Sequence, residues 1–292
     1  MVKVAGIDIG GTKIRMAVVD ETGNVFHDER IKTEIPLYPY LEKHVLRLME
    51  NHPEVEAIGI GTHGFVDPVN GRIIYATETL PGWTGTEVKK QLEQATGKRV
   101  EVENDANCAV LAEAAFGAAK GKERVVCLTI GTGLGGGILW DGKLLSGGPH
   151  GGAAEVGHML LYPGGVTCTC GRKGCFEQYV SGTALRRRIQ EAGLDIAPDE
   201  LFIKAESDPA AREVVEGFVK DLAYIISTLQ AALDMELVVI GGGVSESAEH
   251  WWHLLSKELD RVLLHPLEVK IAQHENDAGI LGASLLVQGP AN

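Results

Sequence analysis

Two segments of the chain share one plan, and that plan restricts the folds that the chain can adopt. Residues 4–31 read VAGIDIGG-TK-IRMAVVD-ETGN-VFHDERI, and residues 125–147 read VVCLTIGTGLGGG-ILW-DGK-LLSG. Each predicts an apolar strand, a glycine-rich turn, a second strand, a polar turn and a third strand. A dinucleotide-binding fingerprint leads directly into a helix, so the G-x-G-x-x-G spacing at Gly131, Gly133 and Gly136 is weak evidence for such a site.

The rest of the chain alternates between helical and strand patterns. Helices are expected near 38–51, 85–96, 182–192, 209–233 and 246–261, with others starting at 105 and about 277. Strands are expected at 55–62, 99–104, 236–243 and 267–272, and a glycine-heavy loop at 147–176. This order predicts an α/β protein with two halves around a cleft, each half beginning with a three-stranded hairpin unit.

Composition excludes several classes of function. The 292 residues are 45% hydrophobic and 23% charged, which is typical of a soluble globular protein. The net charge of −13 argues against nucleic-acid binding, although backbone N–H groups could still hold an anionic ligand. The N-terminus shows no export signal and no apolar run is long enough to span a membrane, so we expect a cytoplasmic protein without membrane attachment.

Three glycine-rich segments each end an apolar strand: residues 6–13 (GIDIGGTK), 131–137 and 241–243. Glycines allow backbone N–H groups to approach phosphate oxygens, Thr12 adds a hydroxyl donor, and Asp8 could hold a water of Mg²⁺. Each segment alone could equally be a tight turn. Together they predict that the three turns converge on one nucleotide.

The segment ENDANC, residues 103–108, places an acid where a strand ends and a helix begins. Asp105 at this point could simply cap the helix. A carboxylate at the carboxyl end of a strand also faces the crevice of an α/β fold, where it could accept the proton of an attacking hydroxyl.

The segment CTCGRKGCFE, residues 168–177, contains three of the five cysteines. Cys168, Cys170 and Cys175, with His158 ten residues upstream, form the Cys₃His set of a structural zinc site. A disulfide between Cys168 and Cys175 is the alternative, but it disagrees with a reducing compartment, and no C-x-x-C redox motif is present. Cys108 and Cys127 are interpreted as small core residues.

The motifs DIGGTK, NDANCAVLAE, EVGH and C-x-C-G-x-x-G-C-x-E occur in this order, and together with the closing DAGILGA segment they resemble the ROK family, on its sugar-kinase side. The resemblance covers essentially the whole chain. It implies the actin-like ATPase fold, built from two ribonuclease-H-like domains. We therefore expect one domain at 1–117 plus 277–292, and a larger one at 118–276 that carries the zinc loop.

The resemblance also implies a role for each matching residue. Asp105 would be the general base on the 6-hydroxyl of a hexose, and the sugar would be bound by Gly64, Asn104, Asp105, Glu155, His158 and Glu177. The ATP and its Mg²⁺ would be held by Asp8, Gly10, Gly11, Thr12, Lys13, Thr132, Gly133, Gly135, Gly136 and Gly137, with Gly241, Gly242 and Gly243 near the adenosine. The zinc would orient Glu177 and His158 toward the sugar, so metal loss should spare the phosphate turns. A homodimer is also implied.

Two positions depart from the family pattern beside the expected sugar pocket: Thr79 stands where Asn is frequent and His63 where Pro is frequent. These departures leave the identity of the sugar open, while the kinase class stands. Glucose is the leading sugar, followed by N-acetylmannosamine or N-acetylglucosamine, with fructose and mannose as further alternatives. Polyphosphate as a donor also stays open, although no basic track is visible.

Two other classes compete with a kinase. A sugar-sensing regulator of the same family would need a DNA-binding helix-turn-helix before the first motif. We expect none, because that motif begins at Asp8, and the acidic charge also opposes DNA binding. A filament or chaperone ATPase of the actin-like fold would not need the zinc loop that ends in Glu177.

Overall fold

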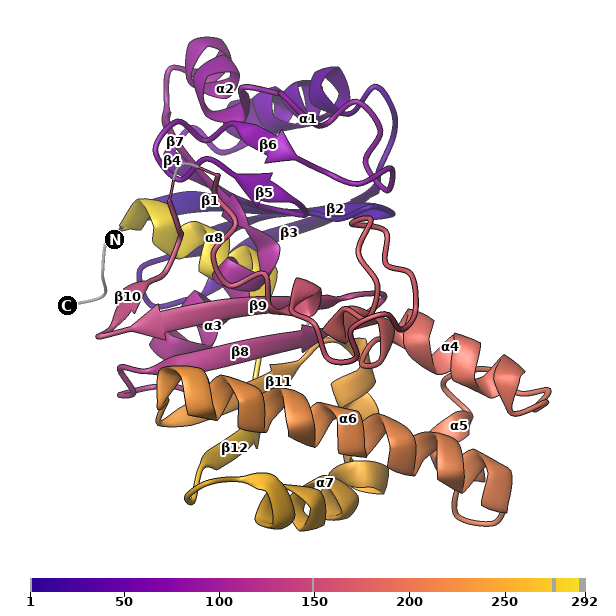
Figure 1. Cartoon of the computed structure of the whole chain (residues 1–292). Coiled ribbons are helices and arrows are strands. Elements are labelled where there is room, and N and C mark those ends of the chain that lie inside the picture. Colours follow the sequence, from indigo (N-terminus) through magenta and orange to yellow (C-terminus); the bar gives the residue numbers. More distant parts are fainter. Residues whose placement is uncertain (1, 149, 275–276, 289–292) are drawn as a thin grey trace.

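Two five-stranded sheets form the centre of the computed structural model, which describes residues 2–148, 150–274 and 277–288 (Figure 1). The first sheet has the order β3-β2-β1-β4-β7. Its strands are β1 (Lys3–Ile9), β2 (Lys13–Asp20), β3 (Val25–Lys32), β4 (Val55–Thr62) and β7 (Arg99–Asn104). β1, β2 and β3 pair antiparallel, whereas β1, β4 and β7 run parallel.

The second sheet repeats this plan in the order β10-β9-β8-β11-β12. Its strands are β8 (Val125–Ile130), β9 (Leu134–Trp140), β10 (Lys143–Leu144), β11 (Leu237–Gly241) and β12 (Glu268–Ile271). The hairpin strands are again antiparallel, and β8, β11 and β12 are parallel. The duplicated hairpin unit predicted from the sequence is therefore confirmed.

The helices lie in three layers around the two sheets (Figure 1). α1 (Leu37–Asn51) and α2 (Val88–Thr96) share the core on the outer face of the first sheet. α3 (Asp105–Phe116) and α8 (Ala278–Gln288) fill the space between the sheets, where apolar residues of both helices meet β2, β8 and β11. α4 (Gly182–Glu191), α5 (Leu201–Lys204), α6 (Pro209–Leu233) and α7 (Ala248–Val262) share the core on the far face of the second sheet.

Glycines bring α8 into direct backbone contact with the first sheet. A Cβ on Gly59 would lie 1.7 Å from the carbonyl oxygen of Ala283, and one on Gly6 would lie 2.2 Å from that of Ile280. Gly282 makes a similar approach to Cys108 in α3. Backbones this close leave no space for a side chain, so α8, which follows the last strand of the second sheet in the chain, packs directly on the first sheet.

Most predicted elements are confirmed within two or three residues of their expected ends. α2 begins later than expected, at Val88, because Gly85 before it has a left-handed φ of +87°. Short elements were not predicted: the hairpin β5 (Phe65–Val66) with β6 (Ile73–Tyr75), the helix α5, and three single 3₁₀ turns, η1 (Val156–His158), η2 (Phe176–Gln178) and η3 (Gly243–Ser247). Among the described residues, no helix has the length and apolar character needed to cross a membrane.

The carboxylate of Glu113, in the last turn of α3, binds both segments that cross between the sheets. Its side chain is fully buried. It accepts hydrogen bonds from the N–H of Ala118, on the crossing from α3 to β8, at 2.8 Å. It also accepts them from Gln273 at 3.0 and 3.1 Å and from His274 at 2.8 Å, on the crossing from β12 to α8. This one side chain therefore ties the two crossings together.

We predict that Glu113→Gln lowers the free energy of unfolding by about 2–4 kcal/mol. Both carboxylate oxygens accept backbone N–H groups, so the amide nitrogen of a glutamine would face a donor that it cannot satisfy. Urea unfolding measures the change. Glu236→Gln is the matched control, since Glu236 accepts two backbone N–H groups at an exposed position, and it should have a much smaller effect. Equal losses of unfolding free energy in the two variants would contradict the role of Glu113 in joining the two crossing segments.

Candidate functional site

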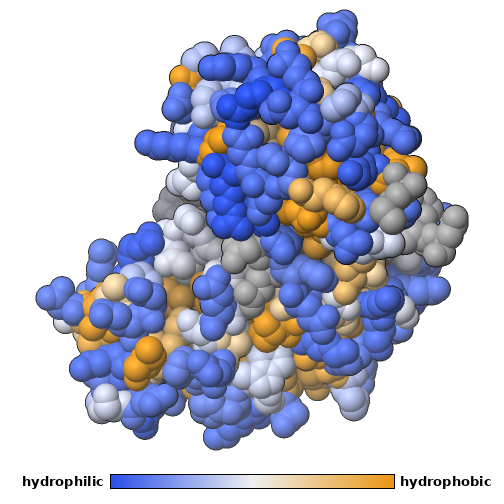
Figure 2. Space-filling model, turned by 180° about the vertical axis from the view of Figure 1, so that it is seen from behind, coloured by the Kyte–Doolittle hydropathy of each residue, from blue (hydrophilic) through white to orange (hydrophobic). Residues whose placement is uncertain are grey.

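The predicted site residues follow strands that end at the same edge of each sheet. In the first sheet Ile9 pairs with Thr62, and Thr62 pairs with Asn104, so β1, β4 and β7 end side by side. In the second sheet Gly241 pairs with Thr129, so β8 and β11 also end together. Figure 2 shows a notch in the molecular outline, at its left, between the upper and lower halves. Parallel strands of α/β folds present ligand sites at this carboxyl edge.

Asn104, and not Asp105, caps helix α3. Its side-chain oxygen accepts the N–H groups of Ala106 at 2.8 Å and Asn107 at 3.3 Å, so the expectation that Asp105 is the N-cap is wrong. Asn104 also donates its amide N–H to the carbonyl of Gly64 at 3.1 Å. The Asp105 carboxylate accepts only the N–H of Ala106 among the described hydrogen bonds, through Oδ1 at 2.8 Å. Capping therefore does not explain an acid at this position.

Gly64 and its neighbours form the wall beside Asn104. Gly64 has a φ of +112°, and a Cβ there would lie 2.5 Å from the carbonyl oxygen of Tyr75, so only glycine fits. His63 Nε2 lies 3.0 Å from the hydroxyl of Thr77, which donates to the hydroxyl of Thr79 at 3.0 Å. The two positions at which the chain departs from the family pattern thus belong to one chain of hydrogen bonds.

Four carboxylates extend from the first half of the molecule into the second. Burial raises the pKa of Asp8 to about 6, and the charge of Asp105 adds to the shift, while Lys13 and Arg15 oppose it. Burial likewise raises the pKa of Glu155 to about 7, with contributions from Asp105 and then Glu177. Asp8 and Glu155 each feel the charge of Asp105, so both lie near it. Acids with raised pKa values in one cleft are typical of a functional site.

The first glycine turn, residues 10–12, joins β1 to β2. Gly10 donates its N–H to the carbonyl of Lys13 at 3.0 Å, and the hydroxyl of Thr33 donates to the carbonyl of Gly10 at 2.8 Å. A Cβ on Gly11 would lie 2.3 Å from the Thr79 methyl group, which links this turn to the wall that contains His63.

The second glycine turn, residues 131–133, joins β8 to β9. Gly242, at the end of β11, has a φ of +85° and lies against the backbone of Ile130, so the third glycine segment adjoins this turn. Gly135, Gly136 and Gly137 lie inside β9 instead of in the turn. A Cβ at Gly137 would meet Ala106 in α3 and one at Gly136 would meet Ala154, so these glycines allow close packing of β9. Within the predicted range, Thr132 and Gly133 are the residues of the turn.

His158, Cys168, Cys170 and Cys175 form a compact cluster whose ligand atoms all lie within 4.8 Å of one another. All four come from the loop between β10 and α4, and the cysteines are not in disulfides. Cys170 Sγ lies 3.6 Å from Cys175 Sγ, and Cys168 Sγ lies 3.7 Å from His158 Nδ1. Sulfur ligands about 2.3 Å from a tetrahedral zinc lie about 3.8 Å apart, so the donor set and its spacing fit a metal ion.

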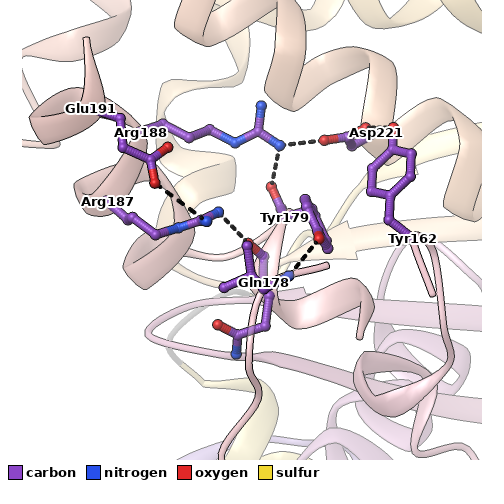
Figure 3. Close-up of polar contacts among 8 residues, drawn as sticks. Tyr162, Gln178, Tyr179, Arg187, Arg188, Glu191 and Asp221 are labelled. Atoms are coloured by element: carbon purple, nitrogen blue, oxygen red, sulfur yellow. Dashed lines mark hydrogen bonds and ion pairs between the residues drawn. The ribbon is translucent and has the colours of Figure 1, made fainter. Parts of the chain in front are cut away.

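A buried ion pair holds this loop against helices α4 and α6 (Figure 3). Arg188 of α4 pairs with Asp221 of α6, and Tyr162 of the loop donates its hydroxyl to Asp221 at 2.6 Å. Arg188 also donates to the carbonyl of Tyr179, and Arg187 donates to that of Gln178 at 2.7 Å. The helices therefore fix the loop on both sides of its cysteines.

Two residues of the site were not predicted. Glu103 is buried beneath Asn104, accepting the backbone N–H of Asn104 at 2.8 Å and the side-chain amide of Asn107 at 3.1 Å. Thr183, at the start of α4, donates its hydroxyl to the carbonyl of Thr132 at 2.8 Å. The position of Glu103 in ENDANC could have drawn attention to it, whereas no local pattern links residues 51 positions apart.

Comparisons with known proteins agree with this fold and site. The model of the ROK family matches residues 4–289, so the chain belongs to the ROK family. A glucokinase of Thermotoga maritima is 34% identical, covering 98% of this chain and 97% of the relative. An N-acetylmannosamine kinase of Vibrio cholerae is 33% identical, covering 97% and 98%. The crystal structure of a Streptomyces griseus ROK family glucokinase in complex with glucose and AMPPNP matches with a TM-score of 0.84 at 33% identity, covering 98% of this chain and 100% of that chain. The actin-like ATPase fold and the sugar-kinase class expected from the motifs are confirmed.

We predict that Asp8→Asn stabilises the protein above pH 6 in the absence of Mg²⁺ and nucleotide. The pKa of Asp8 is raised from 3.8 to about 6 in the folded state, so its ionisation opposes folding and stability is lost as the pH rises through about 6. The advantage of the variant should vanish toward pH 4. Thermal unfolding from pH 4 to 8 measures it.

Asp28→Asn provides a control of opposite sign. Arg15 lowers the pKa of Asp28, so this carboxylate stabilises the folded protein at neutral pH and the contribution is lost as the pH falls. Asp28→Asn should therefore be less stable than the parent at pH 7. If the thermal stability of Asp8→Asn changed with pH in parallel with that of the parent protein, the raised pKa of Asp8 would be refuted.

Proposed function

We propose that the chain is an ATP-dependent hexose kinase that phosphorylates the 6-hydroxyl group of its sugar, with glucose as the leading substrate. The observation that carries this proposal is the Asp105 carboxylate, which is released from capping by Asn104 and lies directly after β7, at the edge where the parallel strands of the first sheet end. The likeness to glucokinases over nearly the full length of the chain supports the choice of sugar.

Asp105 acts as the general base in this proposal. It takes the proton of the 6-hydroxyl as that oxygen attacks the γ-phosphorus in line and the bond to the β-phosphate oxygen breaks, which gives sugar 6-phosphate and ADP. A positioned base contributes about 10²–10⁴ in rate. The remaining acceleration comes from positioning and from neutralising the phosphate charge.

The sugar hydroxyls bind to groups already gathered around Asp105. Asn104 and Gly64 lie on the side of the first sheet, joined by their hydrogen bond. Glu155, His158 and Glu177 lie on the side of the second sheet, where η1, with Glu155 and His158 at its two ends, packs against η2, which contains Glu177. Charged and amide acceptors on two sides of a ring would bind hydroxyl groups through strong hydrogen bonds.

The two glycine turns would hold the ATP phosphates through their backbone N–H groups, with residues 10–13 on one side and Thr132 and Gly133 on the other. Gly241 and Gly242 would lie near the adenosine, next to the second turn. Asp8 would bind a water of the Mg²⁺ that neutralises phosphate charge when bound.

N-acetylmannosamine is the second candidate substrate, because a kinase named for this sugar is 33% identical over nearly its whole length. The hydrogen-bonded series His63, Thr77 and Thr79 begins and ends at the two positions at which the chain departs from the family pattern. This wall beside Gly64 is the first place to look for the residues that select the sugar.

We also propose, from the family resemblance, a cytoplasmic homodimer, and domains at 1–117 plus 277–292 and at 118–276. The close packing of α8 on the first sheet supports the return of the chain to the first domain.

The decisive experiment measures ADP release with ATP against glucose, mannose, fructose, N-acetylmannosamine and N-acetylglucosamine. The parent protein should turn over glucose fastest. Asp105→Asn should fold and bind sugar but lose about 10²–10⁴ in kcat, since an amide accepts no proton at neutral pH.

The control variant is Asp141→Asn, an exposed aspartate in the turn between β9 and β10, which should keep normal activity. A rate that is equally low with all five sugars would contradict the hexokinase proposal. An Asp105→Asn variant that retained more than about a tenth of kcat would contradict the base assignment, because the expected loss is larger.

We propose that the His/Cys cluster binds a structural zinc ion. Three thiolates and one imidazole complete a tetrahedral shell without an open position, which is the pattern of structural and not catalytic sites. The zinc, when bound, would fix the loop that carries His158 and leads into Glu177.

We predict about one zinc per chain in the purified protein, measured by inductively coupled plasma mass spectrometry. Cys170→Ala should lower the zinc content and the melting temperature, because the shell loses a ligand. Cys127→Ala is the matched control, since Cys127 is buried in β8 away from the cluster and should leave the zinc content unchanged. Equal zinc contents in the two variants would exclude this cluster as the site.

A further inference from the structure

The side chain of Glu177 contacts the second glycine turn. Its Oε2 accepts the backbone N–H of Leu134, the residue directly after the turn, at 3.2 Å. A Cβ on Gly133 would lie 2.4 Å from the same oxygen, so the carboxylate rests on the space that a side chain at position 133 would fill. Glu177 is therefore in contact with the turn proposed to hold phosphate, and its own 3₁₀ turn, η2, packs against η1, which follows Glu155 and ends at His158.

The segment that follows Glu177 holds the same turn at two further points. Gly182 donates its N–H to the carbonyl of Gly131 at 2.7 Å. Thr183 donates both its N–H, at 3.2 Å, and its hydroxyl, at 2.8 Å, to the carbonyl of Thr132. Residues 177–183 thus contact the turn along its whole length.

Glu177 itself stands on a backbone that cannot shift independently. Directly before it, Phe176 donates its N–H to the carbonyl of Met159 at 2.8 Å, and the backbone of Cys175 pairs with that of Leu160 in an isolated antiparallel β-bridge. Directly after it, Arg187 and Arg188 of α4 bind the carbonyls of Gln178 and Tyr179 (Figure 3). Because the backbone is fixed on both sides of Glu177, a displacement of its carboxylate is passed to the groups that it contacts and is not taken up by movement of the backbone.

We propose that Glu177 is a positioning residue for the β8–β9 turn and that it couples sugar binding to nucleotide binding. One carboxylate oxygen holds the N–H of Leu134, and Glu177 lies in η2, which packs against η1 with Glu155 and His158 at its two ends. A sugar hydroxyl that donates to Glu177 fixes the carboxylate in the position that supports the turn, so the nucleotide then binds to a turn that is already ordered.

This inference rests on the proposed function and changes one expectation drawn from the sequence. The cysteine loop was expected to serve the sugar alone and to leave the phosphate turns independent of it. The contacts of residues 177–183 instead join the end of that loop to the second turn.

The test is isothermal titration calorimetry of a non-hydrolysable ATP analogue with Mg²⁺, with and without saturating glucose. The coupling factor is the ratio of the two dissociation constants. It should be about 5-fold or more in the parent protein, within the usual range for coupled sites. Glu177→Ala should bring the factor to within about twofold of one, because the route through Leu134 is removed.

Glu155→Ala is the matched control. Glu155 belongs to the same carboxylate cluster, but it has no described contact with the turn, so this variant should weaken glucose binding and keep the parental coupling factor. Glu177→Gln is the second variant, which is measured in case Glu177→Ala does not fold. It keeps an oxygen that can accept the N–H of Leu134 but loses the charge, so its coupling factor should lie below that of the parent protein and above one.

A parental coupling factor in Glu177→Ala would overturn the inference, as would an equal loss of coupling in Glu155→Ala. A parent protein that binds both ligands without coupling would also overturn it, while leaving the kinase proposal intact. A parent protein that phosphorylates none of the five sugars would contradict the proposed function, and the inference with it.

Discussion

The buried carboxylate of Glu113 accepts backbone N–H groups from both segments that cross between the two sheets, and this contact fixes the helix that carries Asp105. Asp105 and Glu113 are on the same helix, α3, at its opposite ends. The N-terminal end of α3 carries Asp105 and the C-terminal end binds the crossings at Ala118 and His274. The orientation of α3 relative to the second sheet therefore sets how far Asp105 lies from the residues of that sheet.

Glycine packing makes the same helix layer rigid on its other sides. Gly137 in β9 lets Ala106 of α3 approach the second sheet, and Gly59 in β4 lets α8 approach the first. Gly282 of α8 meets the backbone of Cys108 in α3. Each contact is too close for a side chain, so the two helices and two sheets have little freedom to slide. Glycines that resemble a phosphate motif in the sequence thus serve in part to bring Asp105 to its position.

The sequence was sufficient to predict the helices, the strands and the duplicated hairpin unit, because local residue patterns indicate all of them. The hairpin units show apolar runs separated by glycines, and α6 was predicted at its observed bounds, Pro209–Leu233, from a continuous helical period. The cysteine cluster was also predictable, since metal ligands are few and recognisable by type. The N-cap of α3 could not be predicted, because Asn104 and Asp105 are both good N-cap residues and only the backbone angles of Asn104 decide between them.

Contacts between distant residues explain the rest of what the sequence did not reveal. Nothing near Glu113 signals that two of its three partners are 160 and 161 residues away, and nothing near Glu177 signals its contact with Leu134. Both are acids in ordinary local surroundings that take their importance from backbone N–H groups supplied by other elements. Such acceptors are strong because the donors are fixed and a charged acceptor is involved. In this chain the two carboxylates act at different levels: Glu113 positions one half of the molecule against the other, and Glu177 positions one turn within a half.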